Sequence, residues 1–281
     1  MRLILGSAQF GFRYGLKKTK INRKEFKKIN KILKYNSLTY FDTAINYGSS
    51  QKRIGTLNIK KKIITKIKIP SKKPKNLKRW YYQILLRTLK ELKVKKLYGL
   101  LFHDTSDVFR NKELLNIILE SKKKKLVSKV GISVYDKFEI EKVLKIWKPD
   151  IIQIPLNIFD QRFLKNNFLK KINQHKIQIH VRSCFLNGLL LEKHMKIGKI
   201  ASKNKFKEFV SWCKLKNINQ LTACIHFVKR IKYVHALIVG FNNSKQLDEI
   251  LYSFKKKIIL VPDEFDIKEK KVIDPRKWKI N

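Results

Sequence analysis

Short apolar runs rich in β-branched residues alternate along the chain with longer stretches in which apolar residues recur every three or four positions. The first pattern is typical of buried parallel strands, and the second of amphipathic helices that cover them. The predicted strands are 3–5, 39–41, 63–65, 98–102, 127–132, 151–154, 177–181 and 236–239. The predicted helices are 22–35, 50–57, 74–93, 113–121, 137–147, 160–174, 203–215, 219–231 and 244–254. Strands and helices in this number and alternation predict a (β/α)8 TIM barrel.

An open doubly wound sheet is the competing topology. It usually has fewer strands and a glycine-rich fingerprint in its first strand-to-helix turn. Gly6 and Gly11 flank that turn here, but not at the fingerprint spacing. We therefore expect one barrel domain over residues 1–281, with residues 262–281 as a C-terminal tail that Trp278 anchors. We also expect the irregular segment 182–202, which is partly apolar, to line or cover a substrate pocket.

The chain is strongly basic, with 66 Lys+Arg against 21 Asp+Glu and a formal net charge of +45. Such an excess attracts polyanions, including nucleic acid and anionic membrane surfaces. The lysines are spread along the whole chain, however, and mostly fall between the apolar positions of helices, as in 27–34. That arrangement is typical of solvated helix faces. We interpret the charge as compositional bias and predict no specific nucleic-acid partner.

Other bulk features point to a cytoplasmic protein. The three cysteines have neither disulfide nor metal-site spacing, so we expect no metal. The N-terminus lacks the features of a signal peptide, and no run reaches the roughly 18 apolar residues of a membrane span. No feature of the sequence predicts the oligomeric state.

Ionisable residues follow three successive predicted strands. Asp42 ends the second strand and Tyr47 follows it, while Lys66 ends the third and His103 the fourth. Chemistry in a parallel barrel is placed at the carboxyl ends of the strands, so these residues predict one assembled site. Lys68 faces the same side of an extended strand as Lys66 and is its rival. Asp104 or Asp107 would serve as caps of a following helix.

The motifs at these strand ends resemble, in their order, those of the aldo-keto reductases over nearly the whole chain. The matching segments are 5–11, 41–44 with 47–48, 65–66, 101–103, 130–133, 153–157 and 238–240 with 246–247. The resemblance implies a barrel that reduces an aldehyde or ketone to an alcohol with NAD(P)H. It implies Tyr47 as the general acid and His103 as the residue that orients the carbonyl. Asp42 and Lys66 would be the pair that tunes the acid.

The chemistry of carbonyl reduction calls for these residue types. Hydride transfer builds negative charge on the carbonyl oxygen, so a donor must protonate that oxygen. A tyrosine with the ordinary pKa of about 10 is a weak acid, and we expect the Lys66 ammonium to lower the pKa of Tyr47. Asp42 would supply the counter-charge that a buried ammonium needs. His103 would add a hydrogen bond to the same oxygen.

The resemblance also implies where the dinucleotide binds. Ser133, Gln153 and Asn157 match positions that contact the nicotinamide carboxamide in relatives. Arg182 stands where many relatives stack an aromatic ring on the nicotinamide, and a planar guanidinium can also stack. We expect Cys184 beside it to be inert packing.

The expected phosphate site lies before the last helix. Gly240, Asn242, Asn243 and Ser244 precede that helix, whose free N–H groups and dipole favour an anion, although an ordinary Asn or Ser N-cap is the alternative. Gln246 stands where many relatives carry an arginine for the 2'-phosphate, while Lys245 adds positive charge. We predict NADPH as the cofactor, with NADH as the alternative.

The substrate is expected to be a small carbonyl compound. The opening segment 6–11 and the segment 182–189 resemble a bacterial branch associated with sugar or polysaccharide metabolism, which implies a sugar or sugar derivative. Two alternatives use the same barrel. One is a cofactor-retaining sugar epimerase or dehydratase, and the other is a non-catalytic barrel that binds a cofactor or a polyanion.

Overall fold

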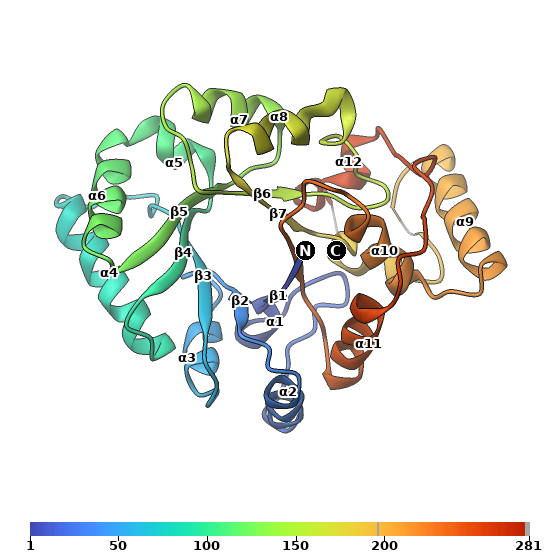
Figure 1. Cartoon of the computed structure of the whole chain (residues 1–281), viewed down its shortest axis with the longest axis horizontal. Helices are drawn as coiled ribbons and strands as arrows, with labels where there is room; N and C mark the ends of the chain where they lie inside the picture. Colours follow the sequence, from blue (N-terminus) through green and yellow to red (C-terminus); the bar gives the residue numbers. More distant parts are fainter. Residues whose placement is uncertain (196, 279–281) are drawn as a thin grey trace.

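The computed structural model describes residues 1–195 and 197–278. Eight parallel strands close into a barrel in chain order, and helices surround it (Figure 1). The strands are β1 Arg2–Gly6, β2 Tyr40–Asp42, β3 Lys62–Ile67, β4 Leu97–Phe102, β5 Val127–Ser133, β6 Ile151–Pro155, β7 Gln178–Arg182 and β8 Ala236–Val239. The predicted TIM barrel is confirmed, and each predicted strand is found within two residues of its expected ends. No helix within the described residues is long and apolar enough to cross a lipid bilayer.

The helices on the outside of the barrel largely match the amphipathic stretches. They are α2 Arg23–Tyr35, α3 Ser50–Gly55, α4 Leu77–Leu92, α6 Lys112–Lys123, α7 Lys137–Leu144, α8 Phe168–Gln174, α9 Ile200–Leu215, α10 Gln220–Lys229 and α11 Ser244–Lys255. The predicted helix 160–174 was too long, because Asn166 and Asn167 have left-handed φ values of 60° and 53°. That conformation interrupts a right-handed helix, so α8 begins only at Phe168.

Several short helices had no counterpart in the prediction. They are α1 Ala8–Gly11, α5 Thr105–Arg110, α12 Lys270–Ile273 and the 3-10 turns Leu186–Leu191 and Pro275–Lys277; a further 3-10 turn, Lys165–Asn167, lies inside the predicted helix 160–174. Each is too short to show a helical period in the sequence. Asp104 caps α5 by accepting a hydrogen bond from the backbone N–H of Ser106 at 2.9 Å, which was the alternative interpretation of this residue.

Apolar side chains form two layers. A large cluster lies between the barrel and the helices, and the interior of the barrel holds a smaller one. This follows from the two-residue period of the strands, which sends alternate side chains inward and outward. The inner cluster consists of Ile4, Ile64, Leu101, Ile151, Ala236 and Ile238. This packed interior gives the loops at the carboxyl end of the barrel a rigid support.

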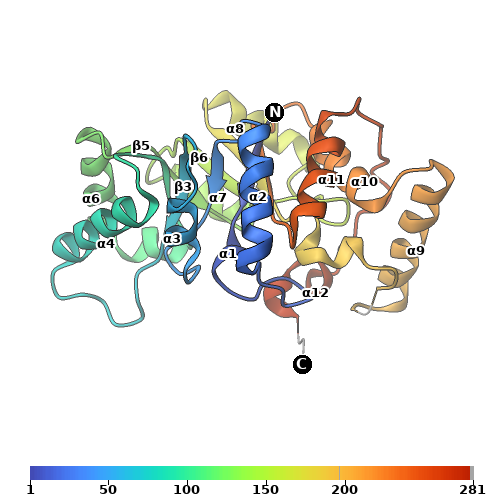
Figure 2. The same ribbon diagram turned by 90° about the horizontal axis from the view of Figure 1, so that it is seen from below.

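The C-terminal tail lies at the end of the barrel where the strands have their carboxyl ends. Figure 2 shows α1, which follows β1, and α12 in the tail at the same end of the molecule. Trp278 packs partly buried against the main cluster, as expected for an anchor, and its indole N–H donates to the carbonyl of Val272 at 2.9 Å. The tail therefore returns to the loops that follow the strands.

Candidate active site

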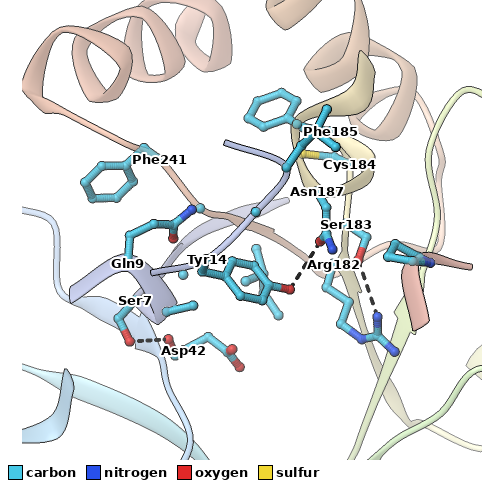
Figure 3. A pocket seen from close by; sticks show the side chains of 18 of the residues that line it. Ser7, Gln9, Tyr14, Asp42, Arg182, Ser183, Cys184, Phe185, Asn187 and Phe241 are labelled. Carbon is cyan, nitrogen blue, oxygen red and sulfur yellow. Dashed lines mark hydrogen bonds between the residues drawn. The ribbon is translucent and has the colours of Figure 1, made fainter. Parts of the chain in front are cut away.

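A cavity of about 460 Å³ opens among the loops at the carboxyl ends of the strands (Figure 3). Of the residues predicted to form the site, the structure places Asp42, Tyr47, Lys66, His103, Ser133, Gln153, Arg182, Gly240, Asn242 and Gln246 in its lining. These positions come from seven different strands, the loops that follow them and, for Gln246, the first turn of α11. The sequence-distant residues of the prediction thus meet in one place.

Asp42 and Lys66 form a buried ion pair at the bottom of the cavity. The Lys66 ammonium donates to Oδ1 of Asp42 and, at 3.2 Å, to the carbonyl of Thr43. Lys66 is 2% exposed and Asp42 is 4% exposed, whereas the rival Lys68 lies on the surface just beyond β3. Lys66 is therefore the lysine that faces the cavity.

Tyr47 is held by the tight loop after β2. Its N–H donates to the carbonyl of Ala44, and its carbonyl accepts from the N–H of Ser50, both at 3.0 Å. The ring lies edge-on to His103, with 6.1 Å between the ring centroids. The Lys66 ammonium is 5.5 Å from the centre of the Tyr47 ring. The phenol, imidazole and ammonium groups thus converge on one part of the cavity.

The electrostatics of Tyr47 differ from the expectation. Burial and then the Asp42 carboxylate raise the pKa of Tyr47 above its ordinary value, and Arg182 is the cation that opposes the rise. The expected net lowering of the Tyr47 pKa was wrong, because burial and the Asp42 carboxylate outweigh the effect of the Lys66 ammonium, which is itself paired with Asp42. A raised pKa keeps Tyr47 protonated at neutral pH.

His103 is neutral at physiological pH. Burial, followed by the positive charges of Lys66 and Arg182, lowers the pKa of His103 to about 4. Its Nδ1 is buried and has no hydrogen-bond partner among the described residues. A neutral imidazole carries one N–H, so it can donate one hydrogen bond to an oxygen in the cavity.

A sequence model of the aldo/keto reductase family matches residues 2–272. The chain belongs to this family. It is accordingly an NAD(P)H-dependent oxidoreductase that reduces carbonyl compounds. A comparison with curated protein sequences gave no match.

Solved structures of aldo-keto reductases share the fold. A putative aldo-keto reductase from Pseudomonas aeruginosa is 19% identical, with a TM-score of 0.65 over 90% of this chain and 88% of that one. The holo form of an aldo-keto reductase from Bacillus halodurans is 16% identical, with a TM-score of 0.74 over 92% of this chain and 88% of that one.

The site of this reductase has a polar atom suited to a nicotinamide. The amide N–H of Gln153 donates to Oδ2 of Asp42 at 2.8 Å, which leaves Oε1 buried without a partner among the described residues. An unpaired buried acceptor is costly, and the carboxamide NH₂ of a nicotinamide is a donor that would satisfy it. Ser133 lies beside Gln153 in the register of β5 and β6. Both residues therefore fit the cofactor that the family uses.

Asn157 does not fit this role. It is fully buried, its Oδ1 accepts from the N–H groups of Phe159 and Asp160, and its Nδ2 donates to the carbonyl of Ser183 at 3.1 Å. These bonds fix the loop after β6. The structure does not support the expected contact of Asn157 with the nicotinamide, because Asn157 lies outside the cavity lining and its side chain bonds within the protein.

The loop before α11 is braced by other segments of the reductase. The Asn242 side chain accepts a hydrogen bond from the hydroxyl of Thr19, and its backbone N–H donates to Oε1 of Gln246 at 2.7 Å. Asn243 supplies the N-cap of α11 by accepting from the N–H of Gln246 at 2.8 Å. The N-cap interpretation is thus confirmed for Asn243.

Ser244, at the first position of α11, binds a carboxylate of the reductase itself. Its hydroxyl and its backbone N–H both donate to Oε1 of Glu25 on α2. The hydrogen bond from Ser244 lowers the pKa of Glu25, so the group is a carboxylate at neutral pH. Glu25 therefore occupies the donors of Ser244, one of the residues of the predicted phosphate site.

Arg182 stacks inside the protein. Its guanidinium lies 4.1 Å from the centre of the Tyr135 ring and donates to the carbonyl of Val134 at 3.1 Å. The neighbouring Cys184 is buried, and burial raises the pKa of its thiol, which agrees with a packing role.

The sequence interpretation missed several residues of the cavity. Tyr14 reaches over it and donates to Oδ1 of Asn187 at 3.2 Å, as Figure 3 shows, and Leu16 N–H binds the carbonyl of Asn187 at 2.9 Å. Tyr135 and, from the tail, Arg276 also line it. They lie in loops, and loop residues carry no periodic signal that would mark them. The expectation that segment 182–202 lines the pocket is confirmed for residues 182–192, as Phe185, Asn187 and Leu191 show, whereas none of the described residues after 192 in this segment is in the lining.

Proposed function

We propose that Tyr47 is the general acid of this reductase and that its substrate is a sugar or sugar derivative with an aldehyde or ketone group. The observation that carries the proposal is the convergence of Tyr47, His103 and the Lys66–Asp42 pair on one cavity. The bound nicotinamide would supply the hydride. Every further step uses groups of the chain.

Tyr47 donates the proton. Its raised pKa keeps the phenol protonated at neutral pH, and charge that develops on the carbonyl oxygen makes the transfer favourable. Neutral His103 donates a hydrogen bond to the same oxygen and fixes the direction of the carbonyl. The Lys66–Asp42 pair lies behind the phenol, where the ammonium stabilises the phenolate that remains.

The cofactor is proposed to extend along the cavity from Gln153, at the end of β6, to the loop before α11. Gln153 and Ser133 would hold the carboxamide, and Gly240, Asn242 and Gln246 line the same cavity further along. The sequence favoured NADPH. The Glu25 carboxylate at Ser244 favours NADH instead, because a 2'-phosphate at that helix terminus would meet a like charge.

A matched pair of tyrosine variants tests the general acid. Tyr47→Phe removes the phenol next to His103, whereas Tyr14→Phe removes the other phenol that reaches the cavity. Cofactor oxidation with a panel of sugar carbonyls should fall by roughly a hundredfold or more in Tyr47→Phe. Tyr14→Phe should lose about tenfold or less, since only a hydrogen bond to Asn187 is removed.

Binding of the dinucleotide distinguishes a chemical defect from a folding defect. Fluorescence titration with NADH and NADPH should give Tyr47→Phe the same dissociation constants as the wild type. Full turnover in Tyr47→Phe, or an equal loss in both tyrosine variants, would contradict the assignment of the acid.

A further inference from the structure

The cavity contains one cation that no carboxylate neutralises. Among residues 1–195 and 197–278, the other cations in its lining have acidic partners, whereas Arg182 forms no ion pair. The paired cations are Lys17 with Glu192, Lys66 with Asp42 and Arg276 with Asp274. An uncompensated guanidinium in a partly buried cavity is unfavourable unless a ligand supplies the negative charge.

The orientation of Arg182 is fixed by neutral groups. Its Nη2 donates to the carbonyl of Val134 at 3.1 Å and its Nη1 donates to Oγ of Ser183 at 3.3 Å, while the ring of Tyr135 supports its face. A guanidinium carries five N–H donors in a rigid fork. Only two of these donors have partners in the protein, so the others remain for a ligand. Because the guanidinium is already held in place, it can bind a ligand without rearrangement.

Arg182 lies close to the reacting groups. Its positive charge opposes the rise in the pKa of Tyr47 and contributes to the lowered pKa of His103, which places Arg182 within electrostatic range of the carbonyl position. It also ends β7, and Figure 3 shows it on the side of the cavity opposite Gln9 and Phe241. An anionic group near the carbonyl of a bound substrate could therefore reach it.

The C-terminal tail adds a second arginine. The Arg276 guanidinium lies 3.4 Å from the centre of the same Tyr135 ring and is held by Asp274 through two hydrogen bonds, at 2.9 and 2.7 Å. Its side chain remains half exposed at the mouth of the cavity. The ring of Tyr135 thus carries two guanidinium groups, one inside the cavity and one at its entrance.

We propose that Arg182, supported by Tyr135 and Arg276, is an anion-recognition subsite, and that the substrate is a carbonyl compound bearing a carboxylate or a phosphate. This inference rests on the proposed carbonyl reduction and adds the charge class of its substrate. Arginine forks bind both anions through paired N–H donors, so the shared chemistry is a tetrahedral or planar oxyanion. Arg276, whose charge is paired with Asp274, packs against the Tyr135 ring that supports Arg182.

Matched substrate pairs test the charge class. Succinic semialdehyde is compared with butanal, and glyceraldehyde 3-phosphate with glyceraldehyde. The wild type should show a kcat/KM at least about tenfold higher for the anionic member of one pair, as expected for a charge-assisted contact. The pair that shows the preference tells carboxylate from phosphate. Equal or better turnover of both neutral aldehydes would overturn the proposal.

Variants then assign the preference to Arg182. Arg182→Met should lower the ratio of anionic to neutral kcat/KM roughly ten- to a hundredfold, and Arg182→Lys should retain part of the ratio. The matched control is Arg79→Met, on the exposed face of α4, which should leave the ratio unchanged. Equal losses for both members of a pair together with weaker NADH binding would overturn the proposal, because Arg182 would then serve the cofactor.

A binding experiment separates this proposal from the proposed function. The NADH-bound enzyme is titrated calorimetrically with 4-hydroxybutyrate and with glycerol 3-phosphate, which reduced cofactor cannot convert. Binding in the wild type that is lost in Arg182→Met supports the anion subsite even if no aldehyde is turned over. Turnover of neutral carbonyls without any anion binding would leave the reductase assignment intact and overturn the subsite.

Discussion

Gly11 lies directly against the backbone of Tyr47, and a Cβ atom at Gly11 would come within 1.6 Å of the Tyr47 carbonyl oxygen. Gly11→Ala should therefore displace the Tyr47 loop and lower kcat by roughly a hundredfold, because small misplacements of a catalytic group are costly. Gly55→Ala is the matched control, since its Cβ would come within 1.9 Å of the Glu91 carbonyl between α3 and α4. Both variants should lose stability in urea, but only Gly11→Ala should lose kcat per folded molecule. Equal kcat values would contradict this role of Gly11.

The Lys66–Asp42 pair allows stability to be separated from chemistry. Lys66→Met leaves the Asp42 carboxylate buried without its cation and should reduce the free energy of unfolding by about 3–5 kcal/mol. The double variant Lys66→Met/Asp42→Asn removes both charges, so it should regain much of that loss. Turnover should stay low in both variants, because the phenolate of Tyr47 has lost its cation. Urea unfolding and steady-state kinetics measure the two effects, and restored turnover in the double variant would show that the pair is only structural.

The fold was predictable because its signal is periodic. Each strand interior is a short apolar run, as in Ile151 to Ile154, and register follows once parallel strands close into a barrel. Elements without such a period were missed or misplaced. Helix α8 starts later than predicted because two adjacent asparagines adopt left-handed φ values. The pattern of apolar and polar positions carries no information about such a local backbone conformation.

The catalytic part of the site was more predictable than the rest. Asp42, Lys66 and His103 end or follow strands, and strand ends in a barrel share one face, so their meeting follows from the topology. Contacts made by loops do not follow from it. Glu25 belongs to the predicted helix 22–35, and only the packing of α2 beside α11 brings it to Ser244. Arg276 likewise reaches Tyr135 only through the path of the tail.

His180 gives the protein a specific sensitivity to acid. It is fully buried inside the barrel, both ring nitrogens lack partners among the described residues, and burial lowers its pKa to about 3. An unfolded histidine has a pKa near 6.5, so the unfolded state binds the extra proton between these values. Stability should therefore fall as pH drops below about 6.5, by up to about 1.4 kcal/mol per pH unit from this group.

His180→Leu tests this origin of the acid sensitivity. Denaturant unfolding at pH 7.5 and pH 5 should show a smaller stability loss in His180→Leu than in the wild type, because the protonation penalty is gone. At pH 7.5 the variant should be at least as stable as the wild type, since leucine buries no unpaired nitrogen. His175→Leu, at an exposed position, should keep the wild-type pH dependence. An unchanged slope in His180→Leu would place the acid sensitivity elsewhere.

Glu25 should set the preference between the two dinucleotides. Its carboxylate accepts from the hydroxyl and N–H of Ser244, so a 2'-phosphate at the N-terminus of α11 must compete with it. Glu25→Gln removes the like charge and should tighten NADPH binding roughly three- to tenfold at low salt, with little effect on NADH. Fluorescence titrations with both dinucleotides at two salt concentrations measure this, and the gain should shrink as salt screens the exposed charges. Glu113→Gln on α6 removes an exposed carboxylate elsewhere and should leave the ratio unchanged. Equal shifts in the dissociation constants of NADH and NADPH in Glu25→Gln would contradict this prediction, because the carboxylate would then act through the conformation of the loop and not on the 2'-phosphate.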